Sequence, residues 1–359
     1  MKKYKFTGKT KKIGKITVRR IQAIAAFGTV KVGDLGGWIE NEGNLSQEGN
    51  AWVYGDAIVY NNAVVYDTAK VWGTAKVYGD AEIYGNAEIY DFAQVCGDAK
   101  IYGNAIVYNN AKVYGNAKVC DNTKVYGDAK IYDAKVYDNA QVCNTAEVYD
   151  NAKVYGNAIV GDTAKVYGNA IVCVTAQVYG NAQVWGNAQV WGNAKVYGNA
   201  AVYGNAAVYG NAQVCDTAKV CDNAIVYSNA IVYGNAQVYG DAMVCCTAQV
   251  WGNAKVYGTA EVCGTAKVYG NAIVCDTAAV CGNAEVFSLN HILVIGPMGS
   301  RNDFTTFYRD KNKQITVRCG CFLGKIDKFL ERVQETYGDG HYALAYRMAA
   351  ELAKIQIVG

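Results

Sequence analysis

The sequence of 359 residues contains one proline and two histidines. The proline, Pro297, lies near the C-terminal end, so no proline before it removes a backbone donor from a strand. Both histidines, His291 and His341, also lie late in the chain. Histidine is the most frequent general base in enzymes, and the long segment before residue 290 therefore has no evident one.

Long hydrophobic runs and a strong charge imbalance are also absent. Because there is no run of 18 apolar residues, we expect no membrane span, and the N-terminus does not resemble an export signal. These features predict a cytoplasmic protein whose 13 cysteines are reduced thiols. The net charge is +3, and the basic residues of segment 1–20 are interpreted as a solvated lead-in strand, which argues against a nucleic-acid partner.

A six-residue pattern, A-x-[VI]-[YWC]-[GD]-[NDT], recurs about 40 times from Ala51 to about residue 289. In an extended segment, positions 1 and 3 point to one side and positions 2 and 4 to the other. Glycine and asparagine tolerate left-handed backbone angles, so each hexad can end in a corner. Helix is excluded, because a Gly-Asn pair in every hexad is unfavourable in helices.

Three such corners close a coil of 18 residues, and stacked coils pair equivalent strands in parallel, about 4.8 Å apart. The predicted fold is an all-β solenoid, a left-handed triangular parallel β-helix of about 13 coils. We expect a capping segment at 1–50, the solenoid at 51–289 and an α+β module at 290–359. The hexad that begins at Ala129 is one residue short, which predicts a tightened corner with the strands still in phase.

The stretch GGWIENEGNLSQEGNAWVYGDA, Gly36 to Ala57, and the hexads after it resemble the YdcK-type bacterial β-solenoid family over about residues 17–289. The frame V-Y-G-N-A-x is similar to the left-handed β-helix hexapeptide pattern, which has glycine or a small polar residue where this chain has Tyr, Trp or Cys. The resemblance implies a β-solenoid that is often labelled a putative transferase. Hexapeptide acyltransferases use a histidine that projects from a coil, and these hexads contain none.

Position 4 supplies the candidate binding surface. Steps of 18 residues place an outward aromatic column at Tyr54, Trp72, Tyr90, Tyr108 and Tyr126. Such a column could serve as a platform for sugars, peptides or a second copy, or the rings could pack on each other and stiffen the stack. Both interpretations remain open at this point.

Cysteine shares position 4 with the aromatic residues. Cys245, Cys263 and Cys281 are also 18 residues apart and should stack on consecutive coils. Because cysteine replaces aromatic residues there, we interpret it as a small apolar filler and expect neither a metal site nor a cofactor. Cys319-Gly-Cys321 lacks the usual CxxC spacing and is interpreted in the same way.

Residues 290–359 read as a strand, HILVIG, a hairpin, FTTFYRDKNKQITVRCG, and two helices. Apolar residues spaced for one helix face define the first helix from Ile326 and the second from Leu344 to Ile355. The motifs GPMGSRNDFTTFYR and CGCFLG resemble a small domain that accompanies such solenoids in phage and Gram-positive bacterial proteins. The densest polar cluster of the chain lies here, and it could bind an anion or partner or form a turn: Arg301, Asn302, Asp303, Thr305 and Thr306.

Repetition of one surface suits many weak contacts better than chemistry at a single site. The sequence therefore predicts a non-enzymatic structural or binding rod whose aromatic columns contact a macromolecular partner or a second copy. The alternative is a hexapeptide-type acyltransferase, which would bind an acyl-CoA between coils of neighbouring subunits.

Overall fold

A computed structural model describes residues 2–357. The chain forms a parallel β-solenoid of about 14 turns, followed by a module with a four-stranded sheet and two helices. The expected all-β solenoid with a small α+β module is thereby confirmed. The chain divides into two compact units, one ending at Asn181 and the other beginning at Ala182.

The N-terminal unit begins with an antiparallel hairpin of β1 (Tyr4–Ile13) and β2 (Ile16–Ala23). Next, β3 (Leu35–Ile39) pairs with β2 antiparallel and with β5 (Ile58–Val59) in parallel. After the short 3-10 helix Glu42–Asn44, a parallel bridge joins Leu45 to the following turn. The residues before Ala51 thus already form a solenoid turn without hexad letters, and the turns exceed the 13 predicted from the hexads.

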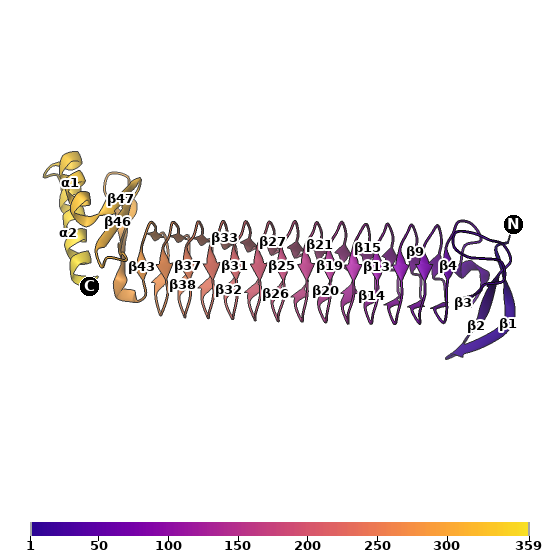
Figure 1. Ribbon diagram of the computed structural model, residues 1–359. Helices are drawn as coiled ribbons and strands as arrows, with labels where there is room; N and C mark the ends of the chain where they lie inside the picture. Colours follow the sequence, from indigo (N-terminus) through magenta and orange to yellow (C-terminus); the bar gives the residue numbers. More distant parts are fainter. Residues whose placement is uncertain (1, 358–359) are drawn as a thin grey trace. The chain divides into compact units, whose positions relative to one another are not determined.

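The repeat strands of this unit are two or three residues long and pair only in parallel (Figure 1). They are β4 (Trp52–Val53), β5 (Ile58–Val59), β6 (Val64–Val65), β7 (Lys70–Val71), β8 (Lys76–Val77), β9 (Glu82–Ile83), β10 (Glu88–Ile89), β11 (Gln94–Val95), β12 (Lys100–Ile101), β13 (Ile106–Val107), β14 (Lys112–Tyr114), β15 (Lys118–Val119), β16 (Lys124–Val125), β17 (Lys130–Tyr132), β18 (Lys135–Val136), β19 (Gln141–Val142), β20 (Glu147–Tyr149), β21 (Lys153–Val154), β22 (Ile159–Val160), β23 (Lys165–Val166), β24 (Ile171–Val172) and β25 (Gln177–Val178).

The C-terminal unit continues the same pattern. Its repeat strands are β26 (Gln183–Val184), β27 (Gln189–Val190), β28 (Lys195–Val196), β29 (Ala201–Val202), β30 (Ala207–Val208), β31 (Gln213–Val214), β32 (Lys219–Val220), β33 (Ile225–Val226), β34 (Ile231–Val232), β35 (Gln237–Val238), β36 (Met243–Val244), β37 (Gln249–Val250), β38 (Lys255–Val256), β39 (Glu261–Val262), β40 (Lys267–Val268), β41 (Ile273–Val274), β42 (Ala279–Val280) and β43 (Glu285–Val286).

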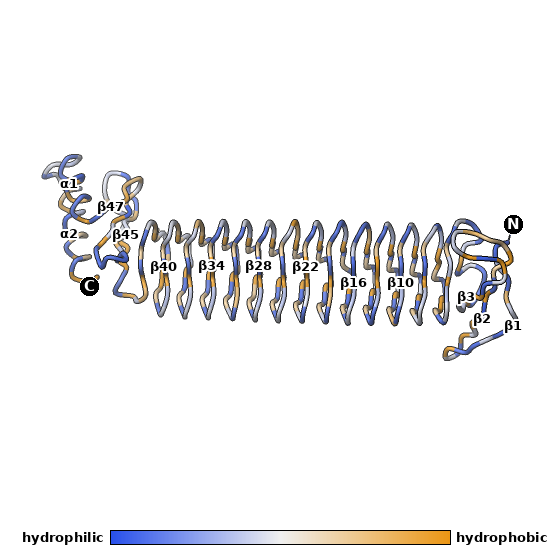
Figure 2. Tube along the Cα trace, in the orientation of Figure 1, coloured by the Kyte–Doolittle hydropathy of each residue, from blue (hydrophilic) through white to orange (hydrophobic). Residues whose placement is uncertain are grey.

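The interior consists of the position-1 and position-3 side chains. Val71, Ala75 and Val77 are fully buried, as are their equivalents in the other turns. Each buried valine contributes roughly 1.5–3 kcal/mol relative to an exposed one. Figure 2 shows hydrophobic residues, in orange, that recur between hydrophilic ones, in blue, along the turns.

Glycine and aspartate are the most frequent of the residues at position 5 that form the corners. Gly79 has φ 74°, and an added Cβ would come within 2.8 Å of the backbone nitrogen of Gly97 in the next turn. Asp67 adopts φ 58°, and its carboxylate accepts the backbone N–H of Gly85 at 3.1 Å. Glycine therefore avoids a clash with the next turn, whereas aspartate offsets its strained backbone with a hydrogen bond.

The short hexad is accommodated as predicted. Asp133 follows β17 with φ 54°, and its carboxylate accepts the backbone N–H of Asn116 at 2.6 Å, one turn earlier. The ladder continues, because Lys118 pairs with Lys135 and its N–H donates to the carbonyl of Ala134 at 2.9 Å. The corner is tighter, and the strands stay in phase.

The module after the solenoid contains an antiparallel sheet in the order β44-β45-β46-β47 and two helices. These elements are η2 (Leu289–His291), β44 (Ile292–Met298), β45 (Asp303–Arg309), β46 (Ile315–Cys319), β47 (Phe322–Lys325), α1 (Ile326–Tyr337) and α2 (His341–Gln356). The strand, hairpin and two helices expected from the sequence are all present. None of the described helices is both long and apolar enough to cross a membrane.

The two helices use their apolar residues differently. In α1, Ile326, Phe329 and Val333 of the predicted stripe are buried. In α2, the predicted stripe is 48–76% exposed and consists of Leu344, Met348, Leu352 and Ile355. The buried face of α2 instead consists of Ala343, Tyr346, Ala349, Ala350 and Ala353. Small alanine side chains let this helix approach its neighbours closely, which the spacing of the larger residues did not indicate.

The uniform interior generates a stability prediction. Val214 in β31 is fully buried, and Val214→Asp would place an unpaired carboxylate there, at a cost of several kcal/mol. We expect a clearly lower thermal unfolding midpoint by circular dichroism. Gln213→Asp is the matched control, because Gln213 precedes it on the outward side of the same strand. Equal midpoints for the two variants would contradict the packed interior.

Candidate functional site

One face of the N-terminal unit carries three parallel rows of side chains. The face belongs to the sheet that contains β4, β7, β10, β13 and β16. The corner row, from position 6, consists of Asn50, Thr68, Asn86, Asn104 and Asn122. The floor row, from position 2, consists of Trp52, Lys70, Glu88, Ile106 and Lys124. The aromatic row consists of Tyr54, Trp72, Tyr90, Tyr108 and Tyr126, the five residues singled out in the sequence.

Four of the five aromatic residues form a continuous stack. Trp72 and Tyr90 have ring centroids 4.4 Å apart and planes inclined by 23°. Tyr90 and Tyr108 are 5.0 Å apart, and Tyr108 and Tyr126 are 5.1 Å apart, with planes within 16°. Inside the stack the ring faces cover each other, so a ligand beside it would meet ring edges and hydroxyl groups.

Tyr54 does not extend this stack. Its ring meets Trp52 edge-on at 6.5 Å, and its hydroxyl lies 3.3 Å from the Thr29 hydroxyl. A hollow of about 330 Å³ remains at this end of the stack, lined by Thr29, Tyr54, Lys70, Trp72 and Glu88. Trp72, which is 39% exposed, thus lies against open space at the end of the stack.

A larger groove follows the corner row. Its volume is about 520 Å³, and its lining residues are Gly28, Thr29, Asn50, Tyr54, Thr68, Lys70, Asn86, Glu88, Asn104 and Ile106. The hollow and the groove share Thr29, Tyr54, Lys70 and Glu88, so the two spaces adjoin. Together they form a site that spans several turns.

The polar side chains of this groove are already ordered. The Asn86 side-chain amide donates to Asn104 at 3.0 Å, and Asn104 donates to Asn122 at 3.0 Å. Lys70 and Glu88 form an ion pair with a nitrogen–oxygen distance of 3.1 Å. Preordered donors and acceptors lower the entropy cost of binding a ligand.

Burial changes the acidity of the stacked tyrosines. Burial together with a hydrogen bond to Cys143 raises the pKa of Tyr126 to about 12. In another column, burial and the neighbouring Glu82 carboxylate raise the pKa of Tyr66 to about 12. These hydroxyl groups stay protonated at neutral pH and can act as donors.

The predicted polar cluster of the C-terminal module does not form one surface. Thr305 and Thr306 are buried, where the Thr305 hydroxyl donates to the Cys319 sulfur at 3.2 Å and the Thr306 hydroxyl accepts the Ala279 N–H at 3.1 Å. Asn302 forms a turn with φ 51°, and Asp303 accepts the N–H of Phe304 at 2.7 Å.

The remaining residue of that cluster, Arg301, lies with Asp303 beside a cavity of about 520 Å³ within the module. The other lining residues are Cys319, Gly320, Cys321, Phe322, Phe329, Arg332, Val333, Thr336, Tyr337 and Tyr346. This aromatic cavity with a charged rim was not evident from the sequence, because its walls come from β46, α1 and α2.

The histidine nearest the solenoid, His291, is held by its surroundings. Its Nδ1 accepts the backbone N–H of Phe287 at 3.4 Å, and its Nε2 lies 3.2 Å from the Arg309 guanidinium. Burial and the Arg309 charge lower the pKa of His291. The imidazole is therefore neutral near pH 7, and its two nitrogens face two donors, of which a neutral ring can accept only one.

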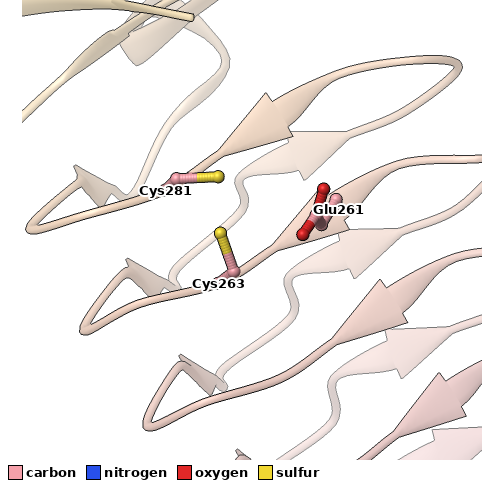
Figure 3. A group of neighbouring side chains, drawn as sticks. All are labelled: Glu261, Cys263 and Cys281. Carbon is pink, nitrogen blue, oxygen red and sulfur yellow. The ribbon is translucent and has the colours of Figure 1, made fainter. Parts of the chain in front are cut away.

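A second group of residues was missed in the sequence because only its cysteines were considered. Glu261 lies two residues before Cys263 and on the same outward side of the chain. In the structure its carboxylate lies beside the sulfur atoms of Cys263 and Cys281 (Figure 3). The sequence Glu261-Val262-Cys263 could have indicated this group, because residues two apart in a strand lie on the same side.

The raised tyrosine pKa values predict a loss of stability at alkaline pH. An unfolded tyrosine ionises near pH 10, whereas Tyr66 and Tyr126 ionise near pH 12 in the folded chain. Their stabilising contribution is therefore complete below pH 10 and is lost as the pH rises to 12. Thermal unfolding measured across this range should show a falling midpoint, with a shallower fall for the double variant Tyr66→Phe/Tyr126→Phe. An equally steep fall in the wild type and the double variant would show that other groups cause the loss of stability at alkaline pH.

Comparisons with known proteins agree with this geometry. The model of the YdcK β-solenoid repeat matches residues 51–67 and 99–115, two segments within the N-terminal unit. No curated protein matches the chain. Both matched segments fold as short parallel strands joined by tight corners, as a solenoid repeat requires. The chain is therefore a β-solenoid protein that carries YdcK β-solenoid repeats at residues 51–67 and 99–115.

Proposed function

We propose that this protein is a non-enzymatic binding scaffold whose three-row face takes an extended macromolecular partner through many weak contacts. The observation that carries the proposal is the hollow of about 330 Å³ between Tyr54 and Trp72, at the end of the four-ring stack. A sugar ring or an aromatic side chain that entered this hollow would continue the stack on Trp72. Offset stacking of this kind contributes about 0.5–1.5 kcal/mol beyond the burial of area.

The groove supports contacts beyond this one ring. The asparagine side chains of the corner row recur once in each turn. A partner that lies along this row would therefore meet equivalent donors and acceptors in successive turns. Single contacts of this kind are weak, but contacts on one chain add through their effective concentration. A second copy of the protein carries the same face and belongs among the partners to be tested.

Two observations weigh against the acyltransferase alternative. His291 is buried with both ring nitrogens facing protein donors, and no corner of the described hexads is extended by an inserted loop. The described residues of the solenoid therefore offer neither a free histidine base nor a loop to hold an acyl carrier.

The first test concerns Trp72. Trp72→Ala should weaken capture of the partner by about tenfold or more, as for a central aromatic contact. Binding would be measured on glycan arrays, by pull-down from a host lysate and by light scattering for self-association. Trp191→Ala is the matched control, because Trp191 is 38% exposed against 39% for Trp72 and also stacks on a tyrosine. Equal losses for both variants would contradict a specific role for the hollow.

The second test removes the whole stack. The quadruple variant Trp72→Ser/Tyr90→Ser/Tyr108→Ser/Tyr126→Ser should abolish association, whereas each tyrosine change alone should have a small effect. The interior valines and alanines are untouched, so the variant should fold with roughly 1–3 kcal/mol less stability. Tyr66→Ser/Tyr84→Ser/Tyr102→Ser removes a comparable stack from another sheet and serves as the control. Association that survives in the folded quadruple variant would show that the rings only stiffen the solenoid.

A third test separates the scaffold from the acyltransferase. Calorimetric titration with acetyl-CoA should give no saturable heat, and common amine or hydroxyl acceptors should not be acylated. Saturable binding that a single coil substitution removes would favour the transferase instead.

A further inference from the structure

The sulfur atoms of Cys263 and Cys281 and a carboxylate oxygen of Glu261 lie within 4.8 Å of one another (Figure 3). Glu261 belongs to β39, and Cys263 directly follows that strand. Cys281 follows β42 in the next turn, which pairs with β39 through Val262 and Val280. The parallel register of two neighbouring turns therefore brings the three groups together.

These two cysteines differ from the others at position 4. Elsewhere a tyrosine hydroxyl of the preceding turn reaches the thiol, as Tyr102 reaches Cys120 and Tyr203 reaches Cys221. The turn before Cys281 instead offers the thiol of Cys263, which lies within 4.8 Å of the Cys281 sulfur. The interaction of the two thiols raises the pKa of Cys263 and lowers the pKa of Cys281. A phenol thus does not occupy the space between these sulfur atoms.

Glu261 also differs from three of the other repeat glutamates, and among the described residues it has no tyrosine donor such as the Tyr269 hydroxyl that Glu285 accepts at 3.1 Å. Glu82, Glu88 and Glu147 each form an ion pair with a lysine of a neighbouring turn. The neighbours of Glu261 in its own row are Met243 and Ala279, and no ion pair with Glu261 occurs among residues 2–357. Its carboxylate is turned toward the thiols without a cation to balance it.

We propose that Glu261, Cys263 and Cys281 bind a thiophilic divalent cation of the Zn²⁺ class, with water in the fourth position. Zinc prefers thiolate, imidazole and carboxylate ligands at about 2.0–2.3 Å in a tetrahedral arrangement. Two sulfur ligands are then about 3.8 Å apart, so the three groups need to close by only about 1 Å.

The charges nearby are compatible with such an ion. Two thiolates and a carboxylate would carry three negative charges, one more than a divalent cation neutralises. The interaction with Cys263 and, to a smaller extent, the positive charge of Arg318 in β46 lower the pKa of the Cys281 thiol, whereas burial and Glu261 raise it. The Arg318 charge therefore offsets part of the remaining negative charge of the site.

An ion at this site would link two of the last turns of the solenoid, next to the C-terminal module. Tyr308 of β45 donates its hydroxyl to the carbonyl of Cys281 at 3.0 Å and accepts the Cys281 N–H at 3.3 Å. An ion between Cys263 and Cys281 would link this clamped turn to the preceding one. Solenoids fray from their ends, so a metal staple here opposes the first step of unfolding.

The test uses Co²⁺ as a spectroscopic probe on the full chain, reduced and freed of metal. We expect one equivalent of Co²⁺ to give a thiolate-to-metal charge-transfer band, which Zn²⁺ then displaces. Cys263→Ser/Cys281→Ser should lose the band, and Glu261→Gln should weaken binding by at least about tenfold. Zn²⁺ should also raise the thermal midpoint of the wild type but not that of the double variant.

Cys215→Ser is the matched control, because Cys215 is a position-4 cysteine whose thiol bonds to Tyr197. This variant should keep the band in full. Circular dichroism will verify that each variant is folded, and Glu261→Gln keeps the test valid if the double variant is not. An absent band in the wild type, or a band that persists undiminished in the folded Glu261→Gln or double variant, would overturn the proposal.

Discussion

The parallel backbone ladder between successive turns is the constraint on which this structure depends. Each strand is only two or three residues long and gains its hydrogen bonds from the turns before and after it. Such short strands are not stable alone, because a few bonds cannot offset the entropy of ordering the chain. Every other feature of the repeat serves to keep equivalent residues in register.

The small interior follows from this constraint. A turn that carried a larger inward residue would push its corner away from the next turn and break the ladder at that point. Thr123 shows how a polar residue is tolerated, because its buried hydroxyl donates to the carbonyl of Cys120 at 2.7 Å. Glycine and aspartate at position 5 serve the same end, since the corner of one turn lies directly against the next.

Strict register also creates the candidate sites. A residue type repeated in the sequence becomes a row in space, so aromatic rings stack and asparagine side chains form a ladder. The two candidate sites lie where one residue of such a row differs from its neighbours in the row. The hollow beside Trp72 exists because Tyr54 turns toward Trp52, and the Glu261–Cys263–Cys281 group exists because cysteine replaces tyrosine in consecutive turns. These differences distinguish one turn from the others, and both proposals rest on them.

Sequence alone determined the solenoid, its inward residues and the shortened corner at Asp133, because each depends on local periodicity and on which residues tolerate left-handed angles. It also determined that Trp72, Tyr90, Tyr108 and Tyr126 share one row. Only the tertiary structure decided that Tyr54 leaves that row, that residues before Ala51 already form a turn, and that α2 buries its alanines and exposes Leu344. These features depend on contacts between segments of different pattern. Periodicity predicts which side chains share a face, but only the packing partner decides which face is covered.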